Sequence, residues 1–158
     1  MAAPTTANDL FARHHRDIYR YLARMTGSRD AADDLSQEVF LRVVRAMRNG
    51  GPVGHERGWV FSIARNLVVD AHRQRVRGIQ VADEFAEPGR AGTQPLSVAL
   101  AQALQQIPDL DREVFLLKEV GGLSYQEIAG LCSCTVEAVR GRLHRTRAML
   151  RGLLSIRF

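Results

Sequence analysis

Cysteine, aromatic residues and long apolar runs are all scarce in this sequence. Its two cysteines, Cys132 and Cys134, cannot form the disulfide framework of a small secreted domain, so we expect reduced thiols. No apolar run approaches the length of a membrane span, and the N-terminal residues MAAPTTANDLF lack the pattern of a signal peptide. These absences predict a cytoplasmic protein without membrane insertion. Aromatic residues make up 6% of the chain, so its cores must be mainly aliphatic.

Lysine is almost absent as well. Lys118 is the only lysine among 22 basic residues, and the net charge is +5. The planar fork of arginine matches phosphate groups and base edges, which favours a nucleic-acid partner, although codon bias in a GC-rich genome explains part of the excess. From Arg140 to the C-terminus there are six arginines and no acidic residue, whereas a solvated helix face normally mixes both signs.

Helix-period patterns fill two parts of the chain and predict an all-α protein made of two small helical domains. The first domain spans residues 8–77 and the second spans residues 96–158. Between them, residues 78–95 carry glycine, proline and acidic residues without a sustained period, which predicts a flexible linker.

One predicted helix of the first domain, over residues 30–47, carries a leucine in the middle of its polar half. Leu41 lies there among Asp34, Gln37, Glu38 and Arg45. A lone exposed leucine usually carries no meaning, but this polar ring suggests the apolar centre of a small partner-binding face. The opposite half is expected to pack in the core, and its residues are Leu35, Val39, Phe40, Val43, Val44 and Met47.

A helix-turn-helix is predicted near the C-terminus. Ser124 and Glu127 form a capping-box pattern that begins its first helix, and Thr135 is a second cap after a tight turn. In this motif the second helix enters the major groove, where its N-terminal residues meet base edges. The residues expected to do so are Thr135, Glu137, Ala138, Arg140 and Gly141. The alternative, a generic amphipathic hairpin, does not explain the lack of acidic residues after Glu137.

The two cysteines at the turn raise the question of a metal or redox site. A structural zinc site needs about four ligands, and none of the five histidines forms a neighbouring ligand pair with the cysteines. Cys132 falls on the apolar face of its helix, where free cysteine packs as a small hydrophobic residue. We therefore expect no metal and no cofactor. No Ser/His/Asp arrangement, glycine-rich phosphate loop or metal spacing indicates an enzyme.

Three motifs resemble, in type, order and spacing, the extracytoplasmic-function (ECF) group of bacterial sigma factors of the sigma-70 family. They are DDLSQEVFLRVVRAM, RGWVFSIARNLVVDAHRQR and LDREVFLLKEVGGLSYQEIAGLCSCTVEAVRGRLHRTRAMLR. The resemblance covers nearly the whole chain, from about Leu10 to Leu154. It implies a protein that binds core RNA polymerase and directs promoter-specific transcription initiation. Its first domain, sigma region 2, would recognise and melt the −10 promoter element, and its second, region 4, would read the −35 element.

The resemblance also implies contact residues in region 2. The face that docks on the clamp helices of the largest polymerase subunit would consist of Asp34, Leu35, Gln37, Glu38 and Leu41. The loop over residues 48–58 and the helix from Trp59 to Arg75 would face the −10 element, with a flipped base at the loop. The candidate contacts there are Arg57, Trp59, Arg65, Asn66, Arg73, Arg75 and Arg77. Packing is the alternative use for Trp59, which starts a helix.

In region 4, the implied −35 contacts extend from Thr135 to Arg147. They add Arg142, His144, Arg145 and Arg147 to the residues named above. Region 4 is also expected to bind the flap of the second-largest polymerase subunit. The turn Ser133-Cys134-Thr135 departs from the Gly-Ile-Pro that is usual in the family, so the −35 sequence preference stays open. By analogy, the lack of an appended C-terminal domain favours regulation by a separate anti-sigma factor.

Two other functions stay open at this point. One is a free-standing helix-turn-helix transcriptional regulator, which ordinarily binds two half-sites as a dimer, although no dimerisation helix is apparent in the sequence. The other is a protein-interaction or redox-sensing module that depends on its cysteines. Such a module would lose its activity or its oxidant response when both cysteines were replaced by serine or alanine.

Overall fold

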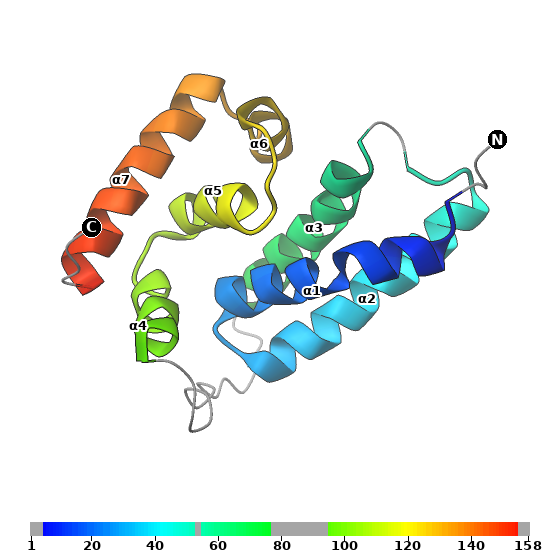
Figure 1. Ribbon diagram of the computed structural model, residues 1–158, viewed down its shortest axis with the longest axis horizontal. Coiled ribbons are helices and arrows are strands. Elements are labelled where there is room, and N and C mark those ends of the chain that lie inside the picture. Colours follow the sequence, from blue (N-terminus) through cyan, green and yellow to red (C-terminus); the bar gives the residue numbers. More distant parts are fainter. Residues whose placement is uncertain (1–4, 53–54, 77–94, 155–158) are drawn as a thin grey trace.

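The computed structural model describes residues 5–52, 55–76 and 95–154, and every regular element within them is an α-helix (Figure 1). The helices are α1 (Ala7–Thr26), α2 (Arg29–Arg48), α3 (Glu56–Val76), α4 (Pro95–Leu104), α5 (Asp109–Glu119), α6 (Tyr125–Cys132) and α7 (Val136–Leu154). The predicted all-α class is confirmed. The predicted linker lies outside the described residues except for Pro95, which begins α4. None of these described helices is long and apolar enough to cross a lipid bilayer.

Helices α1, α2 and α3 form the first of two groups and enclose a mainly aliphatic core. Gly27 ends α1 with φ 73°, a left-handed conformation that glycine adopts without the steric penalty of a Cβ. The chain then reverses, and the Ser28 hydroxyl caps α2 by accepting the N–H of Ala31 at 3.1 Å. Tyr21 of α1 and Phe61 of α3 meet edge to face inside this group, with ring centroids 5.6 Å apart.

Helices α4 to α7 form the second group, in which α5 packs against both α6 and α7. Arg112 of α5 is buried at the start of this group. Its Nη1 donates to the carbonyl of Leu104 at 3.1 Å and to that of Ile107 at 2.9 Å. This guanidinium therefore ties the end of α4 to α5. The largest side chains buried in the group are Leu104, Ile107, Leu116, Leu117, Leu123, Ile128 and Leu143.

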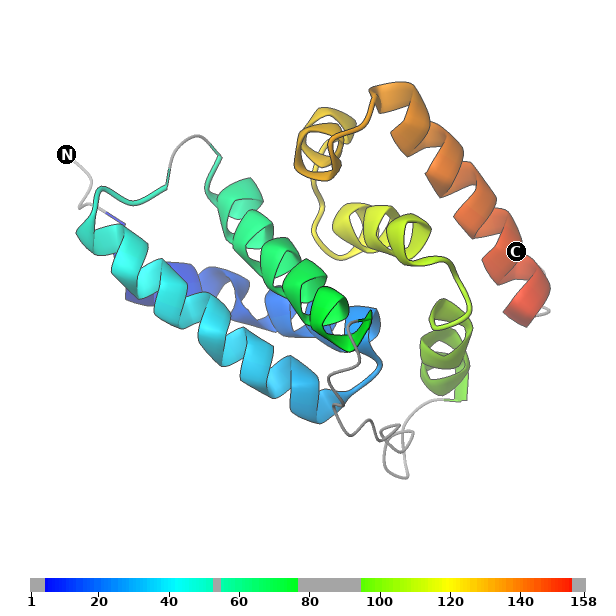
Figure 2. The same ribbon diagram turned by 180° about the vertical axis from the view of Figure 1, so that it is seen from behind.

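The two groups contact each other directly. In both views α5 lies between α7 and the first group (Figures 1 and 2). Helices α4 and α5 contact α1, and side chains of α3 reach α5 and the loop that follows it. The buried apolar residues of both groups form one core cluster that continues across this interface.

Val44 lies on the surface and not in the core. Its side chain is 39% exposed, so the expectation that it packs inside was wrong. Val43 takes the core position at this level of α2, and each step along an α-helix turns the side chain by roughly 100°. That rotation brings Val44 to the rim of the group, next to Leu41.

Candidate nucleic-acid interface

Helices α6 and α7 form the predicted helix-turn-helix. The Ser124 hydroxyl accepts the N–H of Glu127 at 3.0 Å, and the Glu127 carboxylate accepts the N–H of Ser124 at 2.9 Å, which confirms the capping box. Ser133 ends α6 in the left-handed region, with φ 54°. The Thr135 hydroxyl then accepts the N–H of Ala138 at 3.0 Å, which confirms the second cap. Local hydrogen bonds therefore define the N-terminal end of each of the two helices.

The two cysteines at the turn differ in their surroundings. Cys132 is 8% exposed and packs in the core, as expected for a small hydrophobic residue. Burial raises the pKa of its thiol to about 12, so the thiol is protonated at neutral pH. A protonated thiol is neither a good metal ligand nor a good nucleophile. Cys134 is half-buried, and the described residues include no cluster of three or more metal-ligating side chains.

The outer face of α7 carries most of the predicted −35 contacts. Arg140 lies over the ring of Tyr125, with its guanidinium carbon 5.4 Å from the ring centroid. This cation–π contact orients an exposed arginine near the N-terminus of α7. Among the predicted residues, Thr135, Glu137, Arg140, His144 and Arg145 are exposed, and Ala138, Gly141, Arg142 and Arg147 are half-buried.

Three arginines of α7 form ion pairs with carboxylates of α5: Arg142 and Arg145 with Asp111, and Arg147 with Glu119. Arg142 Nη1 donates to Asp111 Oδ1 at 2.6 Å, and Arg147 Nη2 donates to Glu119 Oε2 at 3.0 Å. Asp111 is buried, so its carboxylate draws Arg142 inward and ties α7 to α5. Arg142 stays a predicted DNA contact, but to reach DNA its side chain would have to leave this ion pair.

Helix α2 carries the predicted polymerase contacts. Asp34, Gln37 and Leu41 are exposed. Glu38 is half-buried, and Leu35 is half-buried and packs against the core of the first group. The polar half of α2 is therefore accessible along its length, with Leu35 at its edge.

An exposed apolar patch, the α2 patch, consists of Leu41 and Val44, which lie one helical turn apart on α2 and are 51% and 39% exposed. Phe11 of α1 is 46% exposed. The Phe11 ring stacks on His15, with centroids 4.4 Å apart, and meets Phe40 edge-on at 5.1 Å. Large apolar side chains gathered on a surface commonly mark an interaction site. Sequence reasoning found Leu41 from its polar neighbours but missed Phe11, which lies on another helix.

Helix α3 carries the predicted −10 contacts. Asn66 and Arg73 are exposed on it, in accord with a role in strand contact. Trp59 is half-buried and packs against the core. Packing was the alternative to a DNA contact that the sequence left open for this residue. Arg75 and Arg77 lie outside the part of the chain whose side chains the structure describes.

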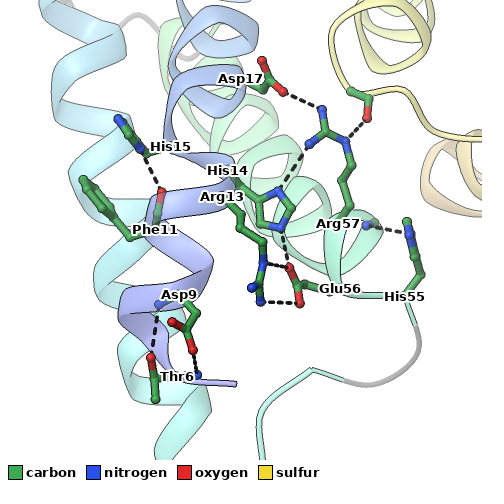
Figure 3. A network of polar contacts seen from close by, with 12 residues as sticks. Thr6, Asp9, Phe11, Arg13, His14, His15, Asp17, His55, Glu56 and Arg57 are labelled. Carbon is green, nitrogen blue, oxygen red and sulfur yellow. Dashed lines mark hydrogen bonds and ion pairs between the residues drawn. The ribbon is translucent and has the colours of Figure 1, made fainter. Parts of the chain in front are cut away.

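Arg57, at the start of α3, joins the two groups (Figure 3). Its Nη2 donates to Asp17 Oδ2 at 2.8 Å and to the carbonyl of Val120 at 2.9 Å, and its Nε donates to the carbonyl of Gly121. Its Nη1 lies 3.3 Å from His14 Nδ1. Burial acts to raise the pKa of the Asp17 carboxyl, but the hydrogen bonds and positive charges of Arg57 and Arg20 together outweigh it, and the pKa lies below its ordinary value.

Arg65, one of the predicted strand contacts, is paired with Glu113 of α5. Its Nε donates to Glu113 Oε2. Glu113 is 4% exposed, and this burial raises the pKa of its carboxyl above the ordinary value even though Arg65 acts in the opposite direction. A buried carboxylate is costly to leave without a partner, so Glu113 favours retention of Arg65.

Sequence reasoning missed the buried charges of α5. Asp111, Arg112 and Glu113 are all buried. Periodicity assigns charged residues to solvent, although Asp111 precedes the inward-facing Val114 by one helical turn and shares its face. That spacing was a signal that at least one of these charges lies inside and needs a partner.

Comparison with known proteins identifies the family. The model of Sigma-70 region 2 matches residues 10–78, and the model of Sigma-70, region 4 matches residues 97–150. ECF RNA polymerase sigma factor EcfG of Rhodopseudomonas palustris is 32% identical to the chain, over 84% of this chain and 76% of EcfG. The chain belongs to the ECF group of sigma-70 family RNA polymerase sigma factors. Its function is to direct transcription initiation.

Further relatives of this sigma factor agree with that assignment. RNA polymerase sigma factor CarQ of Myxococcus xanthus is 35% identical, over 92% of this chain and 87% of CarQ. ECF RNA polymerase sigma factor SigE of Mycolicibacterium smegmatis is 32% identical over 98% of this chain, which spans 63% of SigE.

Solved structures share the fold of this sigma factor. CnrH, in complex with the cytosolic domain of CnrY, aligns with a TM-score of 0.71 and 27% identity, over 94% of this chain and 87% of that chain. The sigma factor RpoE of Bartonella quintana, in complex with the anti-sigma factor NepR, aligns with a TM-score of 0.81 and 23% identity, over 96% and 98% of the two chains. Both alignments extend over the first and the second helical group.

Proposed function

We propose that this sigma factor binds core RNA polymerase through α2 and reads its promoter through α3 and α7. The observation that carries this proposal is the separation of the exposed candidates onto different helices. Candidate polymerase contacts are exposed on α2, and candidate −35 contacts are exposed on α7. Separate faces allow one chain to hold the polymerase and DNA at the same time.

Region 4 is proposed to insert α7 into the major groove of the −35 element. The N-terminal residues of a recognition helix meet base edges, and Thr135, Glu137 and Arg140 are exposed at that end. A bidentate arginine–guanine contact is worth roughly 1–3 kcal/mol of discrimination. We assign that role to Arg140, which Tyr125 already orients. His144, exposed one turn farther along α7, is proposed to contact the sugar-phosphate backbone.

Region 2 is proposed to dock on the clamp helices of the largest polymerase subunit. Interfaces commonly place a few buried apolar anchors inside a polar rim. The α2 patch provides such anchors, and Asp34 and Gln37 are exposed on the same helix. Leu41, its most exposed member, is the proposed central anchor. Region 4 is proposed to bind the flap of the second-largest subunit.

Region 2 is also proposed to contact the −10 element as its strands separate. Asn66, Arg65 and Arg73 of α3 are the proposed strand contacts, and the loop over residues 48–58 would receive a flipped base. Extruding one base costs a few kcal/mol, which stacking and phosphate contacts can offset. Of these three side chains, Asn66 and Arg73 are exposed as they stand.

A polypeptide that blocks polymerase binding is the proposed regulator. The similar RpoE structure contains the anti-sigma factor NepR, and the CnrH structure contains the cytosolic domain of CnrY. We propose that an anti-sigma factor binds this chain as well, because an exposed apolar patch suits a protein partner.

Reconstituted transcription tests the proposed function. The purified chain is mixed with core RNA polymerase and genomic DNA from its host, and the 5′ ends of the transcripts are sequenced. New start sites that share −10 and −35 elements would support the proposal. Specific DNA binding by the chain alone, without polymerase association, would contradict it and favour a free-standing regulator.

A further inference from the structure

We propose that His14 of α1 is a positioning residue for the reading of the −10 element, because it holds Glu56 and Arg57 at the start of α3. The inference rests on the proposed function, in which the loop over residues 48–58 would receive a flipped base. Residues 56–58 belong both to that loop and to the first turn of α3. A side chain that fixes this turn also fixes the end of the loop. His14 therefore acts on the DNA through these two residues and does not touch it.

His14 lies between two charged side chains of α3 (Figure 3). It is 6% exposed, so its imidazole depends on protein groups for hydrogen bonds. Its Nε2 lies 2.6 Å from Glu56 Oε2, and its Nδ1 lies 3.3 Å from Arg57 Nη1. The two partners are 42 and 43 positions farther along the chain. Both ring nitrogens therefore tie α1 to the first turn of α3.

The charge of Glu56 determines the tautomer of His14. Arg13 binds the Glu56 carboxylate with two hydrogen bonds, from Nε to Oε2 at 3.0 Å and from Nη2 to Oε1 at 3.1 Å. The hydrogen bond from Arg13 holds the pKa of the Glu56 carboxyl below its ordinary value against the effect of burial, and His14 adds to this lowering. An ionised carboxylate accepts hydrogen bonds and donates none, so Nε2 of His14 carries the proton. In the neutral ring, Nδ1 then has a lone pair that accepts the N–H of Arg57.

Protonation of His14 breaks one of these two contacts and keeps the other. The imidazolium still donates from Nε2 to Glu56, but it turns an N–H at Nδ1 toward the guanidinium of Arg57. Two donors and two positive charges then face each other, so Arg57 has to move away from the ring. Asp17 of α1 accepts from Nη2 of Arg57 at 2.8 Å and does not replace the contact at Nη1. Histidine changes its charge near physiological pH, so pH reports on this contact in a way that packing alone does not.

Two other histidines lie nearby and have different partners. His55, before the start of α3, has its Nδ1 2.8 Å from Oε2 of Glu127 in α6. His15 has its Nδ1 2.8 Å from the carbonyl of Phe11 and stacks on the Phe11 ring. The groups that region 4 presents to the guanidinium at the start of α3 are uncharged carbonyls. His55 and His15 therefore provide matched controls for His14.

The test compares His14→Gln and His14→Phe in the full chain. The glutamine amide carries both a donor and an acceptor and does not change its charge with pH. Phenylalanine keeps an aromatic ring in the core but offers neither a donor nor an acceptor. His15→Gln and His55→Gln are the controls, because each removes a titrating ring close to His14 and leaves its contacts with Glu56 and Arg57 in place.

Two quantities are measured from about pH 8 to about pH 5.5. The first is the fluorescence of Trp59, the only tryptophan of the chain, in the free protein. Trp59 lies in the first turn of α3, where its N–H donates to the carbonyl of His55 at 3.0 Å. The second is the discrimination by the holoenzyme between promoters that differ at single −10 positions. Discrimination at the −35 element is the internal control.

We expect the emission of Trp59 in the unmodified chain to titrate with pH. Discrimination at the −10 element should fall about fivefold on the acid side, because one hydrogen bond to Arg57 is lost. His14→Gln should keep the discrimination measured near pH 8 and lose both pH responses. His14→Phe should lower −10 discrimination about fivefold even near pH 8, with −35 discrimination unchanged. Both controls should titrate as the unmodified chain does.

Several results would overturn the inference. They are the absence of a pH response in the unmodified chain, a response that persists in His14→Gln, a response that disappears in either control, and equal losses at the −10 and −35 elements in His14→Phe. If His14→Phe does not fold, as circular dichroism detects, the comparison of His14→Gln with the controls still decides. Failure of the proposed function gives a different result: no chain would direct transcription, while the titration of Trp59 in the free protein would still respond to His14→Gln.

Discussion

The arginines of α7 and those of α3 have the same side chain and similar predicted partners, but their surroundings differ. On α7, Arg142 and Arg147 pair with carboxylates of their own region, and Arg140 stays exposed. On α3, Arg57 and Arg65 bind groups of the other region. An arginine side chain is therefore free to contact DNA only where the fold gives it no carboxylate or carbonyl partner. Arg140 is available to DNA as it stands, whereas Arg57, Arg65 and Arg142 would each have to leave a protein partner first.

The largest expected effect concerns the anchoring of α7 within region 4. We expect Asp111→Ala to lower the free energy of unfolding by about 3 kcal/mol, because it leaves the Arg142 charge without its buried partner. Urea denaturation measures this change. Glu137→Ala, at an exposed position of the same helix pair, should stay within about 0.5 kcal/mol. Equal losses in the two variants would show that the pair does not anchor α7.

The next effect concerns base reading by α7. With the holoenzyme, we expect Arg140→Ala to reduce discrimination at one −35 position by about 2 kcal/mol, since it removes a bidentate base contact. Competition between promoters that differ at single −35 positions measures it. Arg151→Ala, exposed near the C-terminal end of α7, is the matched control. A uniform loss over all promoter sequences would identify Arg140 as a phosphate contact.

A smaller effect concerns the predicted polymerase-binding face of α2. This face is exposed to solvent, as is the outer face of α7. We expect Leu41→Asp to weaken binding to core polymerase about tenfold, because a charge replaces an apolar anchor. Fluorescence titration with labelled core polymerase measures the affinity, and circular dichroism checks that cooperative melting is kept. Leu153→Asp, at an apolar position of α7 that is 43% exposed, should weaken the binding much less. An equal loss in both variants would contradict a specific α2 face.

The smallest effect concerns Tyr21, in the part of α1 that approaches α5. Burial raises the pKa of its hydroxyl well above the ordinary value, and the charge of Glu113 adds to that shift. Because the hydroxyl lacks a partner among the described residues, we expect Tyr21→Phe to change the free energy of unfolding by less than about 1 kcal/mol. Thermal denaturation measures it. A clearly larger loss would show that the hydroxyl forms a stabilising hydrogen bond.

Local signals in the sequence predicted much of this fold. The capping pattern of Ser124 and Glu127 and the cap at Thr135 are present as expected, because caps depend on residues only three positions apart. Cys132 packs in the core, as the helical period indicated. Such features need no knowledge of how distant helices meet.

The mistaken or missed features depend on contacts between distant helices. Arg142 was predicted as a DNA contact, but Asp111 of another helix draws its side chain inward. Glu113 was not recognised as the partner of Arg65, since the two are far apart in the sequence and meet only when α5 lies against the first group. A charge pair between two helices does not change the hydrophobic periodicity of either helix sequence, so that periodicity cannot reveal it.

The most direct test of the account is the distance between the two helical groups in the free chain. Fluorophores at Arg16 of α1 and Arg151 of α7, both exposed, report it by single-molecule energy transfer. We predict one short, narrowly distributed distance, because α5 contacts both α1 and α3. A long or broadly distributed distance would contradict the shared interface between the two groups.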